Sequence, residues 1–74
     1  MTEREKKIAI NILKSIVKKH YSSLAELARE LGITSAQPSK WSRGITPIPV
    51  AHALRLSKKY KVSIESLRPD IFKN

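Results

Sequence analysis

The side chains in this sequence that could do chemistry are mostly cations and hydroxyls, and one group of them lies within residues 34–43. If this segment is helical, its outward face is small, polar and basic. That face would carry Ser35, Ala36, Ser39, Lys40 and Arg43. Such groups donate hydrogen bonds and attract negative charge, so the pattern indicates recognition of an anionic partner rather than the making or breaking of bonds.

Catalytic and metal-binding chemistry has little support in the sequence. His20 and His52 lie far apart, neither has a second ligand at metal-binding spacing, and both are expected at the surface. The six acidic residues form no convincing acid and base pair, and there is no nucleophile elbow or phosphate-cradling glycine loop. We therefore expect no enzyme, no metal and no cofactor.

The charge balance is strongly basic. Fifteen Lys and Arg residues stand against six Asp and Glu, which gives a formal charge of +9 and favours nucleic acid over a membrane as the partner. A merely soluble basic domain is the alternative. Cysteine is absent, which is compatible with a reducing compartment. The N-terminal segment is too charged for a signal peptide, so we expect a soluble chain that stays in the cytoplasm.

Two short helices around a glycine turn must position the basic face. Ser23 followed by Glu26 predicts a capping box that starts a helix over residues 23–31. Gly32 follows, where a residue with positive φ is needed. Thr34 is a suitable N-cap for a second helix over residues 34–43, with Trp41 on its buried side.

Three further helices are predicted around this pair, over residues 3–20, 49–61 and 63–68. In the first, five apolar residues recur at helical spacing and predict the buried face: Ile8, Ile12, Leu13, Ile16 and Val17. Pro69 should stop the last helix. There is no strand signal, repeat or linker, so we expect a single all-α domain of five helices over residues 1–74.

The stretch from Ser23 to Arg43 resembles the helix-turn-helix of phage repressors. The resemblance rests on a small residue at the helix crossing, a turn glycine and four apolar positions at family spacing: Ala28, Gly32, Leu27, Leu31, Ile33 and Trp41. Downstream, ITPIPVAHALRLSKKYKVSIESLRPDIF is similar to Cro-like repressors and YdaS-type antitoxins, with a proline-containing loop, a helix and an LRPD-type ending. The resemblance implies a lambda-repressor-like, DNA-binding fold.

Pro38 departs from this family pattern, which places a β-branched residue inside the second helix. Proline has no amide donor and would clash with the carbonyl of Thr34, four residues back. Two interpretations follow. The helix starts at Thr34 and is distorted, which we favour, or it starts later with Pro38 near its first position.

If the resemblance holds, the second helix enters the major groove of double-stranded DNA. Its base-reading residues would be Ser35, Ala36, Ser39 and Lys40. The phosphate-binding candidates would be Arg43, Ser22, Ser23, Lys18, Lys19 and Gln37. Such a short reading surface predicts a homodimer on a palindromic operator.

Three functions remain open on the sequence. The first is a Cro-type transcriptional repressor of a phage or prophage, acting in the bacterial cytoplasm. The second is an antitoxin-like module that neutralises a toxin-like partner protein and autoregulates its operon. The third is nonspecific packaging of nucleic acid, for which affinity would not depend on sequence.

Overall fold

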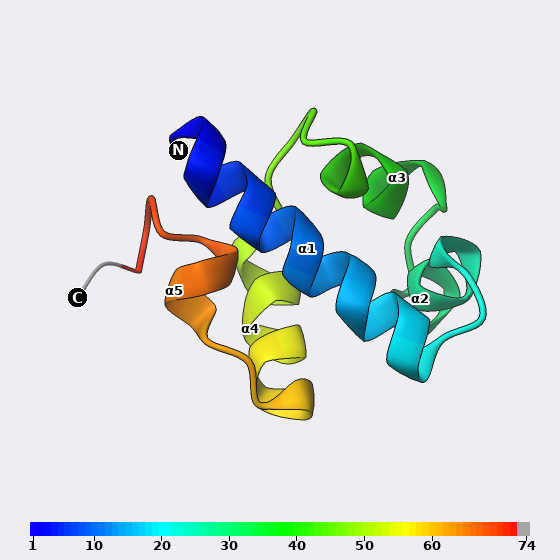
Figure 1. Cartoon of the computed structure of the whole chain (residues 1–74). Helices are drawn as coiled ribbons and strands as arrows, with labels where there is room; N and C mark the ends of the chain where they lie inside the picture. The colour runs from blue at the N-terminus through cyan, green and yellow to red at the C-terminus, as the bar shows by residue number, and fades with distance from the viewer. Residues whose placement is uncertain (73–74) are drawn as a thin grey trace.

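The computed structural model describes residues 1–72, and these form five α-helices and no strand. The helices are α1 (Glu3–His20), α2 (Leu24–Leu31), α3 (Ala36–Ser42), α4 (Val50–Tyr60) and α5 (Ile64–Leu67). In Figure 1, α1 crosses the front of the molecule, α3 lies at the top, and α4 and α5 lie below. Contacts join α2 to α3, α4 to α5, and α1 to both α3 and α5.

The predicted all-α class and the number of helices are confirmed. The bounds of α1 match the prediction, whereas the four later helices are each shorter by their capping residues or by a residue or two at an end. The largest difference is at α3, which begins at Ala36 rather than at Thr34. Residues 73 and 74 of the predicted domain lie outside the described residues.

Helix α1 begins with a capping box that the sequence analysis did not identify. The Thr2 hydroxyl accepts a hydrogen bond from the Glu5 amide at 3.1 Å, and the Glu5 carboxylate accepts one from the Thr2 amide at 2.9 Å. These two bonds satisfy donors that the first turn of a helix leaves free. The predicted apolar face is rotated slightly: Ala9 is buried, whereas Ile8 is 43% exposed, so the expectation that Ile8 joins the core is wrong.

The core draws on all five helices and on one loop residue. Its buried members are Leu13, Leu27, Leu31, Trp41, Ile48, Ala53, Leu56 and Leu67. Leu13, Leu27, Leu56 and Leu67 are fully enclosed, one from each of α1, α2, α4 and α5. Burial of each such side chain stabilises the fold by about 2 kcal/mol. Helices this short are not stable on their own, so they depend on this packing.

A buried arginine fastens the C-terminal turn to the loop after α3. Arg68 donates from Nη1 to the Ile48 carbonyl at 2.7 Å, and from Nε and Nη2 to the two carboxylate oxygens of Asp70 at 3.0 and 2.8 Å. These hydrogen bonds lower the pKa of Asp70 below its usual range. We call Arg68, Asp70 and Ile48 the arginine clamp.

A second polar network joins the ends of α1 and α4 to α2. Glu30 accepts hydrogen bonds from the Tyr21 hydroxyl and the Lys59 ammonium group, and Tyr60 donates to Tyr21 at 2.5 Å. The bond from Lys59, then that from Tyr21, lowers the pKa of Glu30, while burial and the bond to Glu30 raise the pKa of Tyr21. His20 stacks on Tyr60 with 4.3 Å between ring centroids.

Candidate nucleic-acid interface

Helix α2 and its turn hold α3 against the core. Ala28 on α2 is almost fully buried, and α2 contacts α3. Gly32 has φ of 73°, and beyond it the Ile33 amide donates to the Ala28 carbonyl at 3.0 Å. This left-handed residue closes the helix end at little steric cost, as predicted from glycine at this position.

The start of α2 has only half of the predicted capping box. The Ser23 hydroxyl accepts from the Glu26 amide at 3.3 Å, as expected. The Glu26 carboxylate, however, accepts from the Ser22 hydroxyl instead of returning to the Ser23 amide. The Ser22 hydroxyl therefore lies beside a negative charge, which makes it a poorer ligand for phosphate than the sequence suggested, and the Ser23 hydroxyl is already used as a cap.

Pro38 is accommodated because α3 starts late. The Thr34 carbonyl accepts from the Gln37 amide at 3.2 Å, so it does not need the amide that proline lacks. Pro38 becomes the third helical residue, where no intrahelical donor is required, and its ring is fully buried. The preferred start at Thr34 is therefore wrong, and Ser35 occupies the N-cap position without a side-chain capping bond.

The end of α3 is fixed by a second left-handed glycine. Gly44 has φ of 72°, and the Ile45 amide donates to the Lys40 carbonyl at 3.0 Å. A Cβ on Gly44 would lie 3.1 Å from Cδ1 of Ile10, so the turn also packs closely on α1. Trp41 is only 4% exposed, which confirms its predicted place in the core. His52 was expected in solvent but is half-buried, with its ring 5.7 Å from that of Trp41.

Most of the predicted base-reading residues share the exposed side of α3. Ser35, Ala36 and Lys40 are exposed, and so is Gln37. Ser39 is half-buried, and its carbonyl accepts from the Ser42 hydroxyl at 2.9 Å. The short, mostly small side chains allow close approach of a partner to the helix backbone.

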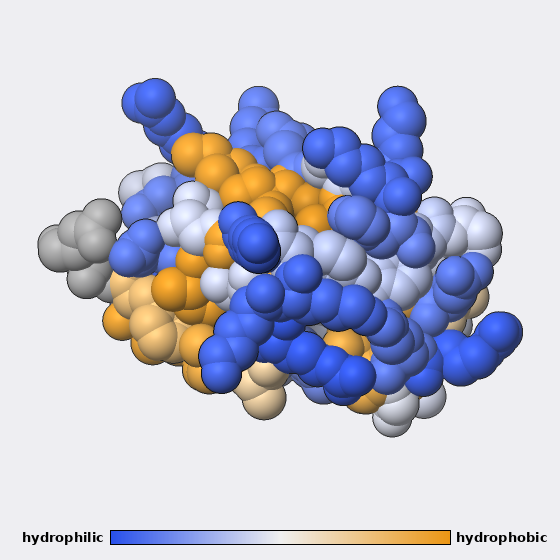
Figure 2. All heavy atoms as spheres, turned by 90° about the horizontal axis from the view of Figure 1, so that it is seen from below, coloured by the Kyte–Doolittle hydropathy of each residue, from blue (hydrophilic) through white to orange (hydrophobic). Residues whose placement is uncertain are grey.

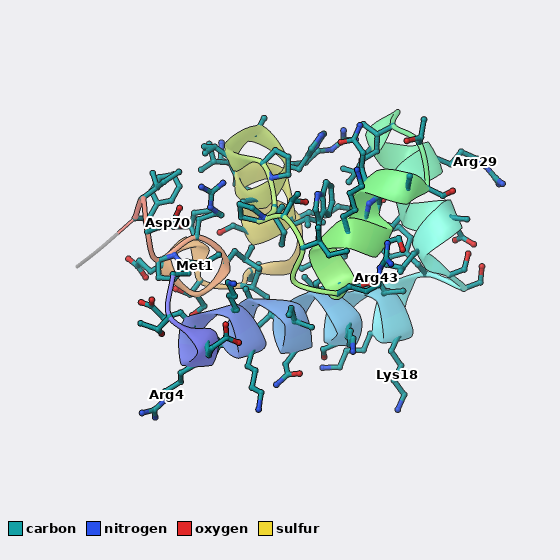
Figure 3. The ribbon with its side chains drawn as sticks, turned by 90° about the horizontal axis from the view of Figure 1, so that it is seen from above. Met1, Arg4, Lys18, Arg29, Arg43 and Asp70 are labelled. Atoms are coloured by element: carbon teal, nitrogen blue, oxygen red, sulfur yellow. The ribbon has the colours of Figure 1, made fainter. Side chains whose placement is uncertain are left out.

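The structure separates the predicted phosphate-binding residues into distinct places. Arg43 lies at the end of α3, where its Nε donates to the Ser39 carbonyl at 3.3 Å. Lys18 points away from α3 and from the rest of the molecule in Figure 3. Lys19 lies beside Tyr60 and Val62, on the side of α1 that faces the end of α4. Only Arg43 and Gln37 therefore stand together with the exposed face of α3.

The charge around α3 is one-sided. Residues 31–64 contain six Lys and Arg and no Asp or Glu, because all six acids fall at positions 30 and below or 65 and above. Lys40 and Arg43 make no ion pair with any residue in the described part of the chain. Their positive charge is thus available to an anionic partner.

The sequence analysis did not identify the arginine clamp. Through Ile48, Arg68 holds the loop between Gly44 and α4. The sequence does contain a signal for it, because Arg68 and Asp70 are separated only by Pro69. This spacing allows an arginine to pair with both oxygens of a carboxylate.

The structure also bears on metal binding and on membrane crossing. Within residues 1–72, no group of three or more His, Cys, Asp or Glu side chains is arranged to hold a metal ion. None of the helices in this range is both long and apolar enough to cross a membrane.

Comparison with known proteins gives one match. The sequence model of a family described as "Bacterial toxin YdaS" matches residues 13–74, which are 62 of the 74 residues. The match starts within α1 and includes both α3 and the arginine clamp. No curated protein and no solved structure matches the chain.

Proposed function

Because this chain belongs to the bacterial toxin YdaS family, whose members are small regulatory modules, we propose that it is a sequence-specific DNA-binding regulator of transcription. In this proposal α3 enters the major groove of an operator, which is wide enough to admit a helix. The chain would act in the bacterial cytoplasm as a Cro-type repressor of a phage or prophage, pairing on a palindromic operator.

One observation carries the proposal. The exposed face of α3 joins small polar side chains to two cations that have no acidic partner within residues 1–72, in a segment of 34 residues without an acid. Lys40 is suited to guanine acceptors, Ser35 to several bases, and the Ala36 methyl to thymine. Arg43 and Gln37, at the end and start of the helix, are suited to the phosphates that fix its register.

The test compares two cations on α3 with one that points elsewhere. We expect log affinity for duplex DNA to fall linearly with log salt, by about 0.9 per phosphate contact. Arg43→Ala should weaken all duplexes alike and reduce that slope by about one unit. Lys40→Ala should instead change which sequence is selected from random duplexes. Lys18→Ala, with the same loss of charge on a side chain directed away from α3, is the control and should do neither.

Two results would overturn the proposal. A salt-independent affinity would remove the phosphate contacts on which it depends. Equal losses for Arg43→Ala and Lys18→Ala would show that binding follows net charge and not the α3 face. Affinity without any sequence preference would favour nucleic-acid packaging.

The family description favours a second candidate, because it names a toxin where the sequence analysis expected an antitoxin. In this alternative the chain belongs to a toxin and antitoxin pair, and its contact with a partner protein is the main activity. Growth of a host expressing the chain separates the two. If DNA binding causes an effect on growth, Lys40→Ala and Arg43→Ala abolish it. If a partner protein causes it, both variants retain it.

A further inference from the structure

A groove runs along α1 on the side of the molecule away from α3. It contains two hollows, of about 170 and 360 Å³. Ile12, Ser15 and Tyr60 line the first, and Ile8 and Pro69 line the second. Figure 2, which views the molecule from below, shows hydrophobic side chains gathered there and bordered by hydrophilic ones.

The α1 side of this groove has the spacing of a helix-pairing face. Its residues follow one another at intervals of three and four: Glu5, Ile8, Ile12, Ser15 and Lys19. They span about 21 Å at 1.5 Å per residue. Ile8 is 43% exposed, Ser15 and Lys19 are exposed, and Ile12 is half-buried against the core. A second helix laid along α1 would bury this face.

The charges at the two ends of the groove identify the partner. Glu5 and Glu65 line one end, whereas Lys19 and His20 line the other. A second copy laid antiparallel brings the opposite order of charges. With Ile12 on the two-fold axis, Glu5 faces Lys19 of the second copy, and Lys19 faces its Glu5. Such a self-complementary patch is what an isologous two-fold interface requires.

We propose that two copies of this chain associate through antiparallel α1 helices along this groove. Glu5, Ile8 and Ile12 precede residue 13, where the family match begins, whereas Ser15 and Lys19 lie within it. The groove lies away from α3, and the two α3 faces would therefore point in opposite directions. This association is distinct from pairing on one operator. If α3 reads DNA as proposed above, the pair can hold two duplexes; the association itself does not depend on that function.

The test measures mass in solution by sedimentation equilibrium without DNA. Ionic strength is kept near physiological, where a Debye length of about 8 Å screens the mutual repulsion of two +9 chains more than it screens contacting charges. We expect the 8.4 kDa chain to shift towards twice its mass as concentration rises. Lys19→Glu should raise the dissociation constant roughly tenfold or more, because it faces Glu5 of the second copy. Lys18→Glu, the neighbouring reversal on a side chain pointing away, should not.

A charge exchange makes the test specific to antiparallel pairing. Glu5→Lys alone should also dissociate the pair, while an equimolar mixture of Glu5→Lys and Lys19→Glu should restore it, because each contact again joins opposite charges. Since Glu5 caps α1, circular dichroism must show that Glu5→Lys remains helical. Ile8→Lys, at an exposed position, gives an arm independent of the cap, with Ile45→Lys, 59% exposed, as its control.

The outcomes decide the proposal. A wild-type chain that stays at 8.4 kDa at every concentration overturns it. Equal dimerisation of Lys19→Glu and Lys18→Glu, or a mixture that fails to restore the pair, also overturns it. DNA binding that Lys40→Ala and Arg43→Ala leave unchanged, with an intact dimer, would count against the proposed function alone.

Discussion

The cations at α3 have different neighbours from those on α4 and after α5. Arg68 donates three hydrogen bonds from a buried position, and Lys59 is paired with Glu30. Lys40 and Arg43 have no acidic partner within residues 1–72. The difference teaches that this small domain uses part of its positive charge to join its helices and loops and leaves another part without an acidic partner. Each side can be tested by removing a charge and measuring what is lost.

The largest effect is expected at the arginine clamp. Arg68→Met removes all three hydrogen bonds and leaves the Ile48 carbonyl and the Asp70 carboxylate without their donor. We expect the free energy of unfolding to fall by about 3 kcal/mol. Arg55→Met, at an exposed position of α4, is the control and should change it by less than about 0.5 kcal/mol. Urea titrations of wild type and the two variants measure the free energies of unfolding. Equal losses for Arg68→Met and Arg55→Met would show that Arg68 has no special role in stability.

A smaller effect, of opposite sign, is expected at the end of α4. The two helix ends beside α3 place glycine in the left-handed conformation, whereas α4 ends on Lys61 with φ of 55°. Lys61→Gly should therefore stabilise the fold by about 1 kcal/mol, because only glycine adopts this conformation without steric cost. The matched changes Gly32→Ala and Gly44→Ala should destabilise it, Gly44→Ala more strongly because Ile10 lies close. Thermal melts give the order, and a destabilised Lys61→Gly would contradict it.

The smallest effect concerns acid sensitivity of the exposed Glu30 network. The folded pKa of Glu30 lies below its ordinary value of 4.5, so the stabilisation is present above pH 4.5 and is lost as pH falls through the folded pKa. We expect wild type to be more stable than Glu30→Gln at pH 7, with a difference that shrinks below pH 4.5. Urea midpoints measured across this range test it. A difference that does not change with pH would assign the role of Glu30 to hydrogen bonding alone.

Local signals in the sequence predicted the parts of the fold that depend on neighbouring residues. Gly32 could be placed because a helix end needs a left-handed residue, and Trp41 because its register on a helix is fixed by its neighbours. The start of α3 could not be placed, because it depends on whether Gln37 relieves Thr34 of the bond that Pro38 cannot make. Both interpretations satisfied the local rules.

Long-range contacts account for the other differences between the prediction and the structure. The clamp joins Arg68 to Ile48, which are 20 positions apart in the sequence. Helical periodicity relates only residues that are close in sequence, so it could not predict this contact. Lys18 and Lys19 are adjacent in sequence, yet one points away from the molecule and the other lies beside Tyr60. Charge composition predicted an anionic partner, but whether Lys18 and Lys19 join Arg43 near α3 depends on how α1 packs.

The burial of Trp41 on the inner side of α3 also gives the chain an intrinsic fluorescent probe. It is the only tryptophan in the sequence and is 4% exposed, so the emission spectrum comes from a single indole on the inner side of that helix. A ligand on the outer face leaves this indole out of water, whereas detachment of α3 from the core transfers it to solvent and shifts the emission to longer wavelength. One fluorescence spectrum therefore distinguishes occupation of the helix from its release.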